Sequence, residues 1–367
     1  MKVVVINQHN PNIFASTHQI AAALADEGAE VHFLSTVEPV DTGLNAHAVK
    51  WTQIPRSKGI MARVPWFRSN SHRIFRFLRE TRPDWIIAQH EYGVPMLIYK
   101  ALTPNGVRCA TYFVDYHGDR KYVAVLRRLA HLIDAYVDIC DVRLRWRQSD
   151  WQRMRAAPFI IRQAPQRRSS ARHTAHHGPI RVAFTNSRYI FGLNRDRLSR
   201  FMTRLCEHGV SVDWYLPGPE EARITARGFS ANPLYRVRDP VEKSRLLETL
   251  GQYDVGLHWA PMVEASYDPD YFNSAASNKI GEYIAAGLVV AHAGNPGLSY
   301  LPNDICSVFD PTDPEAGAEQ LAAALRDRAE IERKREGALR YHLDDMNFEA
   351  QAQPFVRHVM ALPRYLR

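Results

Sequence analysis

The stretch Ser277–Gly297, which reads SNKIGEYIAAGLVVAHAGNPG, decides the fold because it combines a helix start, two opposite charges and a buried strand. Ser277 and Asn278 can cap a helix that begins near Lys279, and the backbone N–H groups of its first turn are suited to a diphosphate. Glu282 lies one turn later on the same face, where its carboxylate can accept hydrogen bonds from the two hydroxyls of a ribose. The stretch therefore predicts the nucleotide-binding corner of a parallel α/β sheet.

Strands and helices alternate along both halves of the chain, a pattern that is typical of parallel sheets. Gly287 is expected to end the helix of the quoted stretch in a left-handed conformation, and the apolar run 288–291 to form a buried strand. We expect two doubly wound domains, 1–165 and 180–346, joined by the polar linker 166–179. The other predicted strands are 3–6, 31–34, 85–88, 107–114, 180–184, 210–216, 234–237 and 253–258, and the other predicted helices are 16–27, 122–133, 143–156, 197–208, 241–250, 314–328 and 329–340.

The run K-x-x-E-Y-x-A-A-G-x-x-V-x-x-x-x-x-x-G, from Lys279 to Gly297, resembles the donor-binding signature of GT-B glycosyltransferases, particularly the retaining glycosyltransferase family 4. The resemblance implies an α/β chain with the GT-B fold, in which two Rossmann-like domains face each other across a cleft. It also implies that 347–367 packs back on the N-terminal, acceptor-side domain. In many members an acidic residue that touches the transferred sugar stands eight positions before the ribose-binding Glu. This chain has Ser274 there, which leaves the identity of the sugar open.

The resemblance assigns roles to residues on several loops. Arg188 matches an arginine that contacts the donor diphosphate, and Arg195 stands near the place of a lysine that usually follows it. His117, at the end of the strand 107–114, matches a histidine beside the donor sugar and is expected to be catalytic, with Asp115 next to it. For Arg188 the alternative is a surface ion pair, and for His117 a local role in its loop.

Other polar loop residues are expected to contact the sugar or the acceptor. His90 and Glu91 follow the strand 85–88, and loops at the carboxyl ends of strands are where open α/β sheets bind ligands. Tyr271, Asn273 and Ser274 belong to an aromatic and acidic loop that directly precedes the quoted stretch. The alternative for this loop is a surface insertion without a role in binding.

Composition agrees with a globular chain of two domains. The 367 residues are 46% hydrophobic and 23% charged, and the four cysteines show no spacing that suggests a zinc site or a disulfide framework. We predict no metal site, because the histidines of the linker are explained by its basic, flexible composition. The N-terminus enters a strand directly and no run of eighteen apolar residues occurs, so we expect a cytoplasmic protein.

Basic and aromatic residues are interleaved in 50–82, within an N-terminal half that carries all of the excess positive charge. Such a surface is attracted to an anionic bilayer, which makes peripheral contact with the inner face of a membrane one expectation. The alternatives are an anionic acceptor and an ordinary surface helix whose apolar face packs on the sheet. Nucleic acid is not expected as a partner, because no binding module is recognised and the C-terminal half is slightly acidic.

The functional hypothesis is a retaining, metal-independent glycosyltransferase that moves a hexosyl or related sugar from a nucleotide-diphosphate sugar to a glycan, glycolipid or small molecule. No cofactor is expected to be permanently bound, and the donor is expected to be a UDP- or GDP-sugar. Two alternatives stay open. One is a nucleotide-sugar epimerase of the same fold, and the other is a non-catalytic scaffold protein that binds a nucleotide or a membrane.

Overall fold

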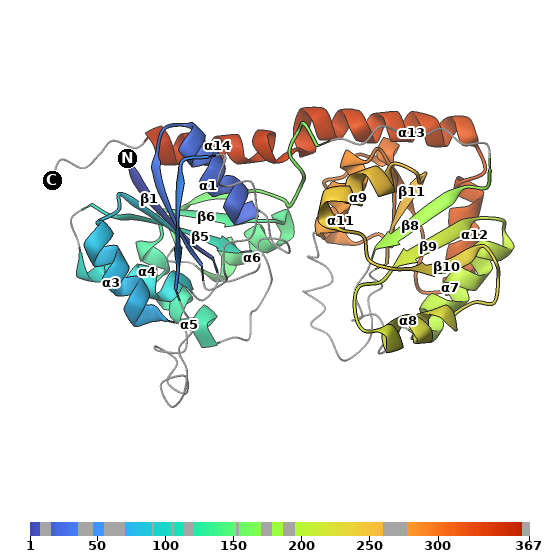
Figure 1. Ribbon diagram of the computed structural model, residues 1–367, viewed down its shortest axis with the longest axis horizontal. Helices are drawn as coiled ribbons and strands as arrows, with labels where there is room; N and C mark the ends of the chain where they lie inside the picture. Colours follow the sequence, from blue (N-terminus) through green and yellow to red (C-terminus); the bar gives the residue numbers. More distant parts are fainter. Residues whose placement is uncertain are drawn as a thin grey trace. The chain divides into compact units, whose positions relative to one another are not determined.

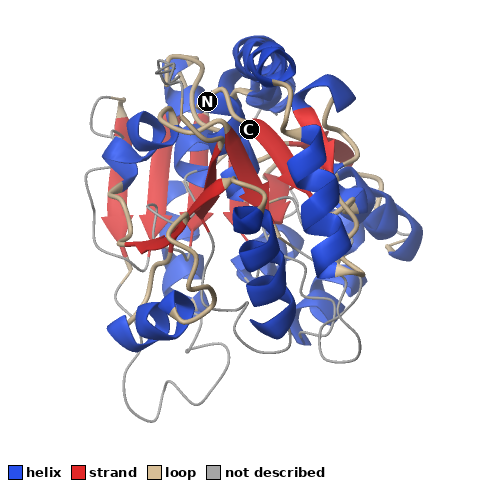
Figure 2. Ribbon diagram, turned by 90° about the vertical axis from the view of Figure 1, so that its right-hand side faces the viewer, coloured by secondary structure: helices blue, strands red, loops and turns tan. Residues whose placement is uncertain are grey.

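The computed structural model describes residues 1–7, 16–35, 47–54, 70–89, 92–103, 106–113, 121–151, 154–169, 178–185, 195–259 and 277–361. The chain divides into two compact units, Met1–Gln163 with Gln351–Arg367, and Ala164–Ala350. Each unit is a parallel sheet covered by helices (Figure 1; Figure 2). The prediction of two doubly wound α/β domains is confirmed. Most of the predicted linker, 170–177, lies outside the described residues.

The first unit has a seven-stranded sheet in the order β3-β2-β1-β4-β5-β6-β7. The inner strand β1 is buried on both faces, as the apolar run Val3–Ile6 predicts. The strands are β1 (Lys2–Asn7), β2 (Glu30–Ser35), β3 (Val49–Gln53), β4 (Trp85–Gln89), β5 (Arg108–Phe113), β6 (Ala135–Asp138) and β7 (Ala157–Ile160), and the helices are α1 (Ser16–Asp26), α3 (Ser71–Thr81), α4 (Gly93–Leu102), α5 (Lys121–Arg128), the 3₁₀ turn η4 (Ala130–Leu132) and α6 (Asp141–Asp150).

Two predicted helices of this unit are wrong in their bounds. The helix expected over 122–133 ends at Arg128 and is followed by a 3₁₀ turn and the strand β6. The helix expected over 143–156 ends at Asp150, because Trp151 turns into the core and packs edge-on against Phe113. Arg147 fixes α6 to the sheet through a buried ion pair with Asp138, 2.9 Å from Nε to Oδ2. The chain then adds the strand β7 instead of more helix.

The described parts of the basic, aromatic region 50–82 are 50–54, at β3, and 70–82, most of which is helix α3. Ile74 and Leu78 are buried in the core of the first unit, and Phe75 packs edge-on against Tyr99 of α4. The arginines of this helix point outward, as in an ordinary surface helix packed on a sheet. The remainder of the region, 55–69, lies outside the described residues. None of the described helices is both long and apolar enough to cross a membrane.

The helix α14 (Phe348–Ala361) belongs to the first unit for most of its length. The ring of His358 contacts Trp85, and the ring of Phe355 contacts Phe159. Gln351 adds a hydrogen bond, in which its Oε1 accepts from the backbone N–H of Arg162 at 2.9 Å. The last helix thereby covers one face of the first sheet around β4 and β7.

The second unit has a six-stranded sheet in the order β10-β9-β8-β11-β12-β13. One face packs on α7, α8 and α12, and the other on α9, α11 and α13. The strands are β8 (Arg181–Thr185), β9 (Ser211–Tyr215), β10 (Tyr235–Arg238), β11 (Val255–His258), β12 (Val289–His292) and β13 (Cys306–Val308), and the helices are α7 (Arg195–Glu207), α8 (Glu220–Arg227), α9 (Lys243–Leu250), α11 (Asn278–Ala285), α12 (Pro314–Ala324) and α13 (Arg328–Tyr341), with short turns η6 (Pro296–Leu298), η7 (Asn303–Ile305) and η8 (His342–Met346).

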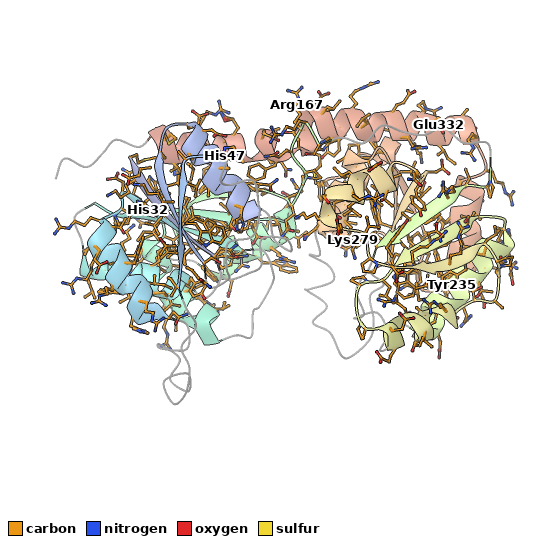
Figure 3. All side chains as sticks on the ribbon, in the orientation of Figure 1. His32, His47, Arg167, Tyr235, Lys279 and Glu332 are labelled. Atoms are coloured by element: carbon orange, nitrogen blue, oxygen red, sulfur yellow. The ribbon has the colours of Figure 1, made fainter. Side chains whose placement is uncertain are left out.

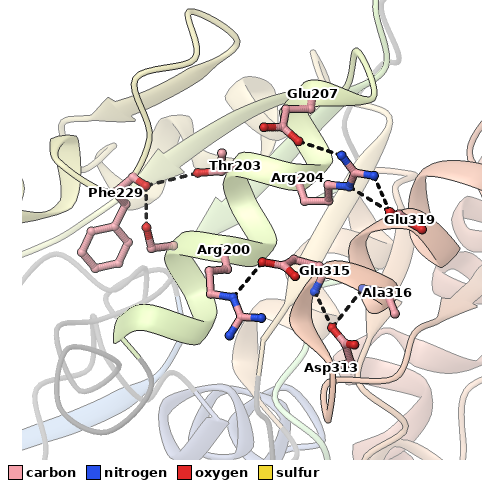
Figure 4. Close-up of polar contacts among 10 residues, drawn as sticks. Arg200, Thr203, Arg204, Glu207, Phe229, Asp313, Glu315, Ala316 and Glu319 are labelled. Carbon is pink, nitrogen blue, oxygen red and sulfur yellow. Dashed lines mark hydrogen bonds and ion pairs between the residues drawn. The ribbon is translucent and has the colours of Figure 1, made fainter.

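Polar contacts align the helices of the second unit. Arg200 and Arg204 of α7 reach Glu315 and Glu319 of α12, with Nε to Oε1 distances of 2.8 and 2.9 Å (Figure 4). Asp313 caps α12 by accepting from two backbone N–H groups of its first turn. The α7–α12 ion pairs are exposed, so they set the position of the helices more than their stability.

Candidate functional site

The candidate site lies at the carboxyl edge of the second sheet, beside the neighbouring strands β8 and β11. The chain leaves β8 toward β9 on one side and leaves β11 toward β12 on the other, so the strand order reverses between them. Open α/β sheets bind their ligands at such a switch point. Helix α11 starts at this edge, after Ser277 in the extended conformation of an N-cap, with φ −76° and ψ 139°.

Tyr283 anchors α11 to this edge. Its hydroxyl accepts from the backbone N–H of Thr185 at 3.0 Å, lies 2.8 Å from Oγ1 of Thr185, and donates to the carbonyl of Leu257 at 3.2 Å. The ring lies directly over Gly256, where any side chain would collide with it. Tyr283 therefore links the helix to the ends of both β8 and β11, and the sequence needs a glycine opposite the ring.

Lys279 lies one turn before Tyr283 on the same face of α11, so the helix places it at the carboxyl ends of these strands. Figure 3 labels its side chain at the start of the helix. Lys279 is half-buried, and burial lowers the pKa of its ammonium group to about 8. The charge of Glu282 raises this pKa, but by less than burial lowers it. A cation that has lost much of its hydration in this way gains strongly from an anionic ligand.

Glu282 faces two cationic side chains. Burial raises the pKa of its carboxyl group to about 7, and the charges of Lys243 and Lys279 oppose this rise. Lys243 is the first residue of α9, and burial lowers its pKa while Glu282 acts in the opposite direction. The sequence analysis missed Lys243, because nothing in the local pattern 241–250 shows that α9 begins beside α11.

Two histidines end the neighbouring strands β11 and β12. His258 and His292 are register partners, and both side chains are buried. Burial, followed by the charges of Lys279 and His292, lowers the pKa of His258 to about 3, so its imidazole is neutral at physiological pH. The Nδ1 atom of His292 accepts from the backbone N–H of Gly294 at 3.2 Å, which places the proton of its neutral ring on Nε2.

The structure brings together four residues that the sequence singled out, Ser277, Asn278, Lys279 and Glu282. One expectation for them is wrong, since the side chain of Ser277 makes no capping hydrogen bond, although its backbone has the N-cap geometry. The left-handed conformation of Gly287 is confirmed, with φ +65°. The strand after it, β12, begins one residue later than predicted.

The other predicted site residues lie in segments that the structure does not describe. Arg195 is the first residue of α7, but its side chain is outside the described part of the structure. Among the described residues, no group of three or more His, Cys, Asp or Glu side chains could hold a metal ion. Outside the described residues are His90, Glu91, Asp115, His117, Arg188, Tyr271, Asn273 and Ser274.

No protein-family model and no curated protein sequence matches the chain. Solved structures do match over nearly the whole length. A glycosyltransferase from Rickettsia africae is 9% identical with a TM-score of 0.73, covering 99% of both chains. HepE of Anabaena, in complex with UDP, is 12% identical with a TM-score of 0.72, covering 99% of this chain and 100% of that one. The chain has the GT-B fold.

Enzymes of more than one kind are similar to this GT-B chain. A putative UDP-N-acetylglucosamine 2-epimerase from Listeria monocytogenes is 11% identical with a TM-score of 0.59, covering 99% of this chain and 98% of that one. At such identities the similarity establishes the fold alone, and the same fold carries different activities. The function of this GT-B chain must therefore be argued from its own residues.

Proposed function

We propose that the chain is a glycosyltransferase whose second unit binds a nucleotide-diphosphate sugar at the start of α11. The observation that carries this proposal is the placement of Lys279 and Glu282 at the switch point of the sheet, held there by Tyr283. The helix N-terminus and the Lys279 ammonium suit the diphosphate, and the Glu282 carboxylate suits the ribose hydroxyls. HepE, a structure with the same fold, was solved in complexes with UDP and with UDP-glucose, which supports a UDP-sugar as donor.

The chemical role of this corner is to stabilise the leaving group. When the bond between sugar and diphosphate breaks, negative charge grows on the diphosphate, and a half-buried ammonium stabilises it more strongly than one in water. We further propose that the enzyme is a retaining, metal-independent member of family 4 that transfers a hexosyl or related group to a glycan, glycolipid or small molecule. In this proposal His117 and Asp115 serve the reacting centre and Arg188 and Arg195 the diphosphate.

The acceptor side is part of the same proposal. His90 and Glu91 are proposed to bind the acceptor, and Tyr271, Asn273 and Ser274 to contact the sugar or the acceptor. Contact of 50–82 with a membrane surface stays a proposal for the segment before α3, because the apolar side chains of α3 itself lie in the core. Such contact would bring the enzyme to a lipid-linked acceptor in the membrane.

The donor site is tested by thermal unfolding with UDP-, GDP-, ADP- and dTDP-sugars. A donor at about a hundred times its Kd is expected to stabilise the protein by about 2.7 kcal/mol. Lys279→Met should remove most of this effect. Glu282→Gln should weaken a ribose donor more than a 2′-deoxyribose donor, because the latter offers the carboxylate only its 3′-hydroxyl. Arg200→Met, in an exposed ion pair on α7, is the control. If no nucleotide sugar stabilises the wild type, the proposal is wrong.

A nucleotide-sugar epimerase is the second candidate, because one similar structure is described as a putative UDP-N-acetylglucosamine 2-epimerase. The two functions differ in their products. A transferase releases nucleoside diphosphate in proportion to acceptor, and NMR of the product shows whether the anomeric configuration is retained. An epimerase converts the donor sugar without any acceptor. Full transfer activity in the presence of EDTA would support metal independence.

A further inference from the structure

The imidazole of His258 is a buried polar group that the proposed binding of ribose and diphosphate leaves unused. It ends β11 and is 4% exposed. Its Nδ1 atom has no hydrogen-bond partner within the described part of the chain. The other residues of β11, Val255, Gly256 and Leu257, are apolar or lack a side chain. A buried ring nitrogen without a partner destabilises the protein, so this histidine needs an explanation other than packing.

The surroundings of His258 identify the kind of ligand. Lys279 of α11 and His292 of β12 are close enough for their charges to disfavour a second proton on the ring. Thr185, at the end of the neighbouring strand β8, is hydrogen-bonded to the hydroxyl of Tyr283. Among the described residues, the groups whose charges act on His258 are Lys279 and His292, and no carboxylate contributes to its lowered pKa. These described surroundings favour an anion over a cation.

We propose that His258 donates a hydrogen bond from Nδ1 to a phosphate oxygen of the nucleoside diphosphate, next to Lys279. This inference rests on the proposed function, because it assumes that the corner binds a nucleotide-diphosphate sugar. The neutral ring carries one proton, and placing it on Nδ1 turns the unpartnered nitrogen into the donor. The two groups then contribute differently to binding. Lys279 supplies a positive charge that is lost as the pH rises above about 8, whereas the neutral ring of His258 supplies a hydrogen-bond donor whose protonation does not change at that pH.

Two substitutions separate this role from a structural one. His258→Phe keeps a planar ring but removes the donor, whereas His258→Asn keeps an amide N–H close to the position of Nδ1. UDP, GDP and their nucleosides uridine and guanosine serve as probes, by calorimetry for the diphosphates and NMR titration for the nucleosides. His258→Phe is expected to weaken diphosphate binding roughly tenfold or more, with nucleoside binding unchanged, since a hydrogen bond to a charged group is lost. His258→Asn should stay within about threefold of the wild type.

The melting temperature of the same variants without ligand also separates the two roles, because a histidine needed for packing would make the variants less stable. Without ligand, His258→Phe should melt at the same or a higher temperature than the wild type, because it removes an unsatisfied buried nitrogen. His342→Phe, which replaces another fully buried histidine of the same unit, controls for the exchange of rings. The inference is overturned if His258→Phe binds the diphosphate like the wild type, if it loses nucleoside and diphosphate equally, or if His258→Asn is as weak as His258→Phe. A wild type that binds neither diphosphate overturns the proposed function as well.

Discussion

Replacing Gly256 by alanine is expected to disable the donor corner without touching any residue proposed to bind the donor. A Cβ atom at this position would lie 2.2, 2.3 and 2.6 Å from Cγ, Cδ2 and Cδ1 of Tyr283, where ordinary contacts begin at 3.4 Å. The ring must therefore move by more than an ångström. Overpacking of this kind costs about 1–3 kcal/mol, and each of the three hydrogen bonds of the Tyr283 hydroxyl adds about 1 kcal/mol when lost, so we expect a loss of about 4–6 kcal/mol.

The loss of binding follows from the shared helix. Tyr283, Lys279 and Glu282 all belong to α11, so a ring that moves displaces the two charged groups with it. Calorimetry with UDP-glucose should show binding weakened at least tenfold, and urea unfolding should show the loss of stability. Gly228→Ala is the matched control, since its nearest neighbour, the carbonyl of Thr225, lies at 3.4 Å.

A double-mutant cycle tests the cause of the effect. In the Tyr283→Ala background the ring is absent, so Gly256→Ala should cost nearly nothing there. An equal loss of stability with and without the ring would refute the reasoning, because the collision would then not be its source.

Three further predictions concern the charges of the second unit. The affinity for UDP-glucose should peak between pH about 7 and about 8. Below this window Glu282 is protonated and no longer accepts hydrogen bonds from the ribose hydroxyls, and above it Lys279 loses its charge. Calorimetry across about pH 6 to 9 should therefore give a bell-shaped profile, and a flat profile would contradict the assignment. The raised pKa of Glu282 also means that its contribution to stability is present below its unfolded value of 4.5 and is lost as pH rises through about 7, so Glu282→Gln should be more stable than the wild type at pH 8. Arg335→Met should lower the free energy of unfolding by about 1.5–3 kcal/mol, since it removes one of the two arginines that pair with the buried Asp254 carboxylate, at 3.1 Å, and the donor to the carbonyl of Gly287, while Arg328 stays 3.3 Å from the carboxylate. Urea unfolding measures this loss, and Arg200→Met, in an exposed pair, should change little.

The parts of the fold that were predictable from sequence are those with a strong local pattern. The apolar runs 3–6 and 288–291 correspond to the buried inner strands β1 and β12, and Gly287 follows α11 with the left-handed backbone expected of it. The strands β6 and β7 were missed, because four-residue runs next to helices carry too little periodicity to be separated from them. The strand β13 is shorter still.

The candidate site was predictable only where its residues share one helix. Lys279 and Glu282 are three positions apart, so helical geometry alone places them together. Lys243 belongs to another helix, and the pairing of His258 with His292 depends on the register of two strands separated by a helix and a long connection. The match between Gly256 and the ring of Tyr283 also exists only once α11 lies on β11. Local sequence carries no signal for contacts of this kind.

The position of α14 has a consequence for the order in which the protein is made. The first unit consists of Met1–Gln163 and Gln351–Arg367, so the ribosome synthesises the whole second unit before the helix that completes the first. Until then the face formed by Trp85 and Phe159 lacks the rings of His358 and Phe355. Although domains generally fold in order of synthesis, this chain is expected to finish its second unit first and its first unit last.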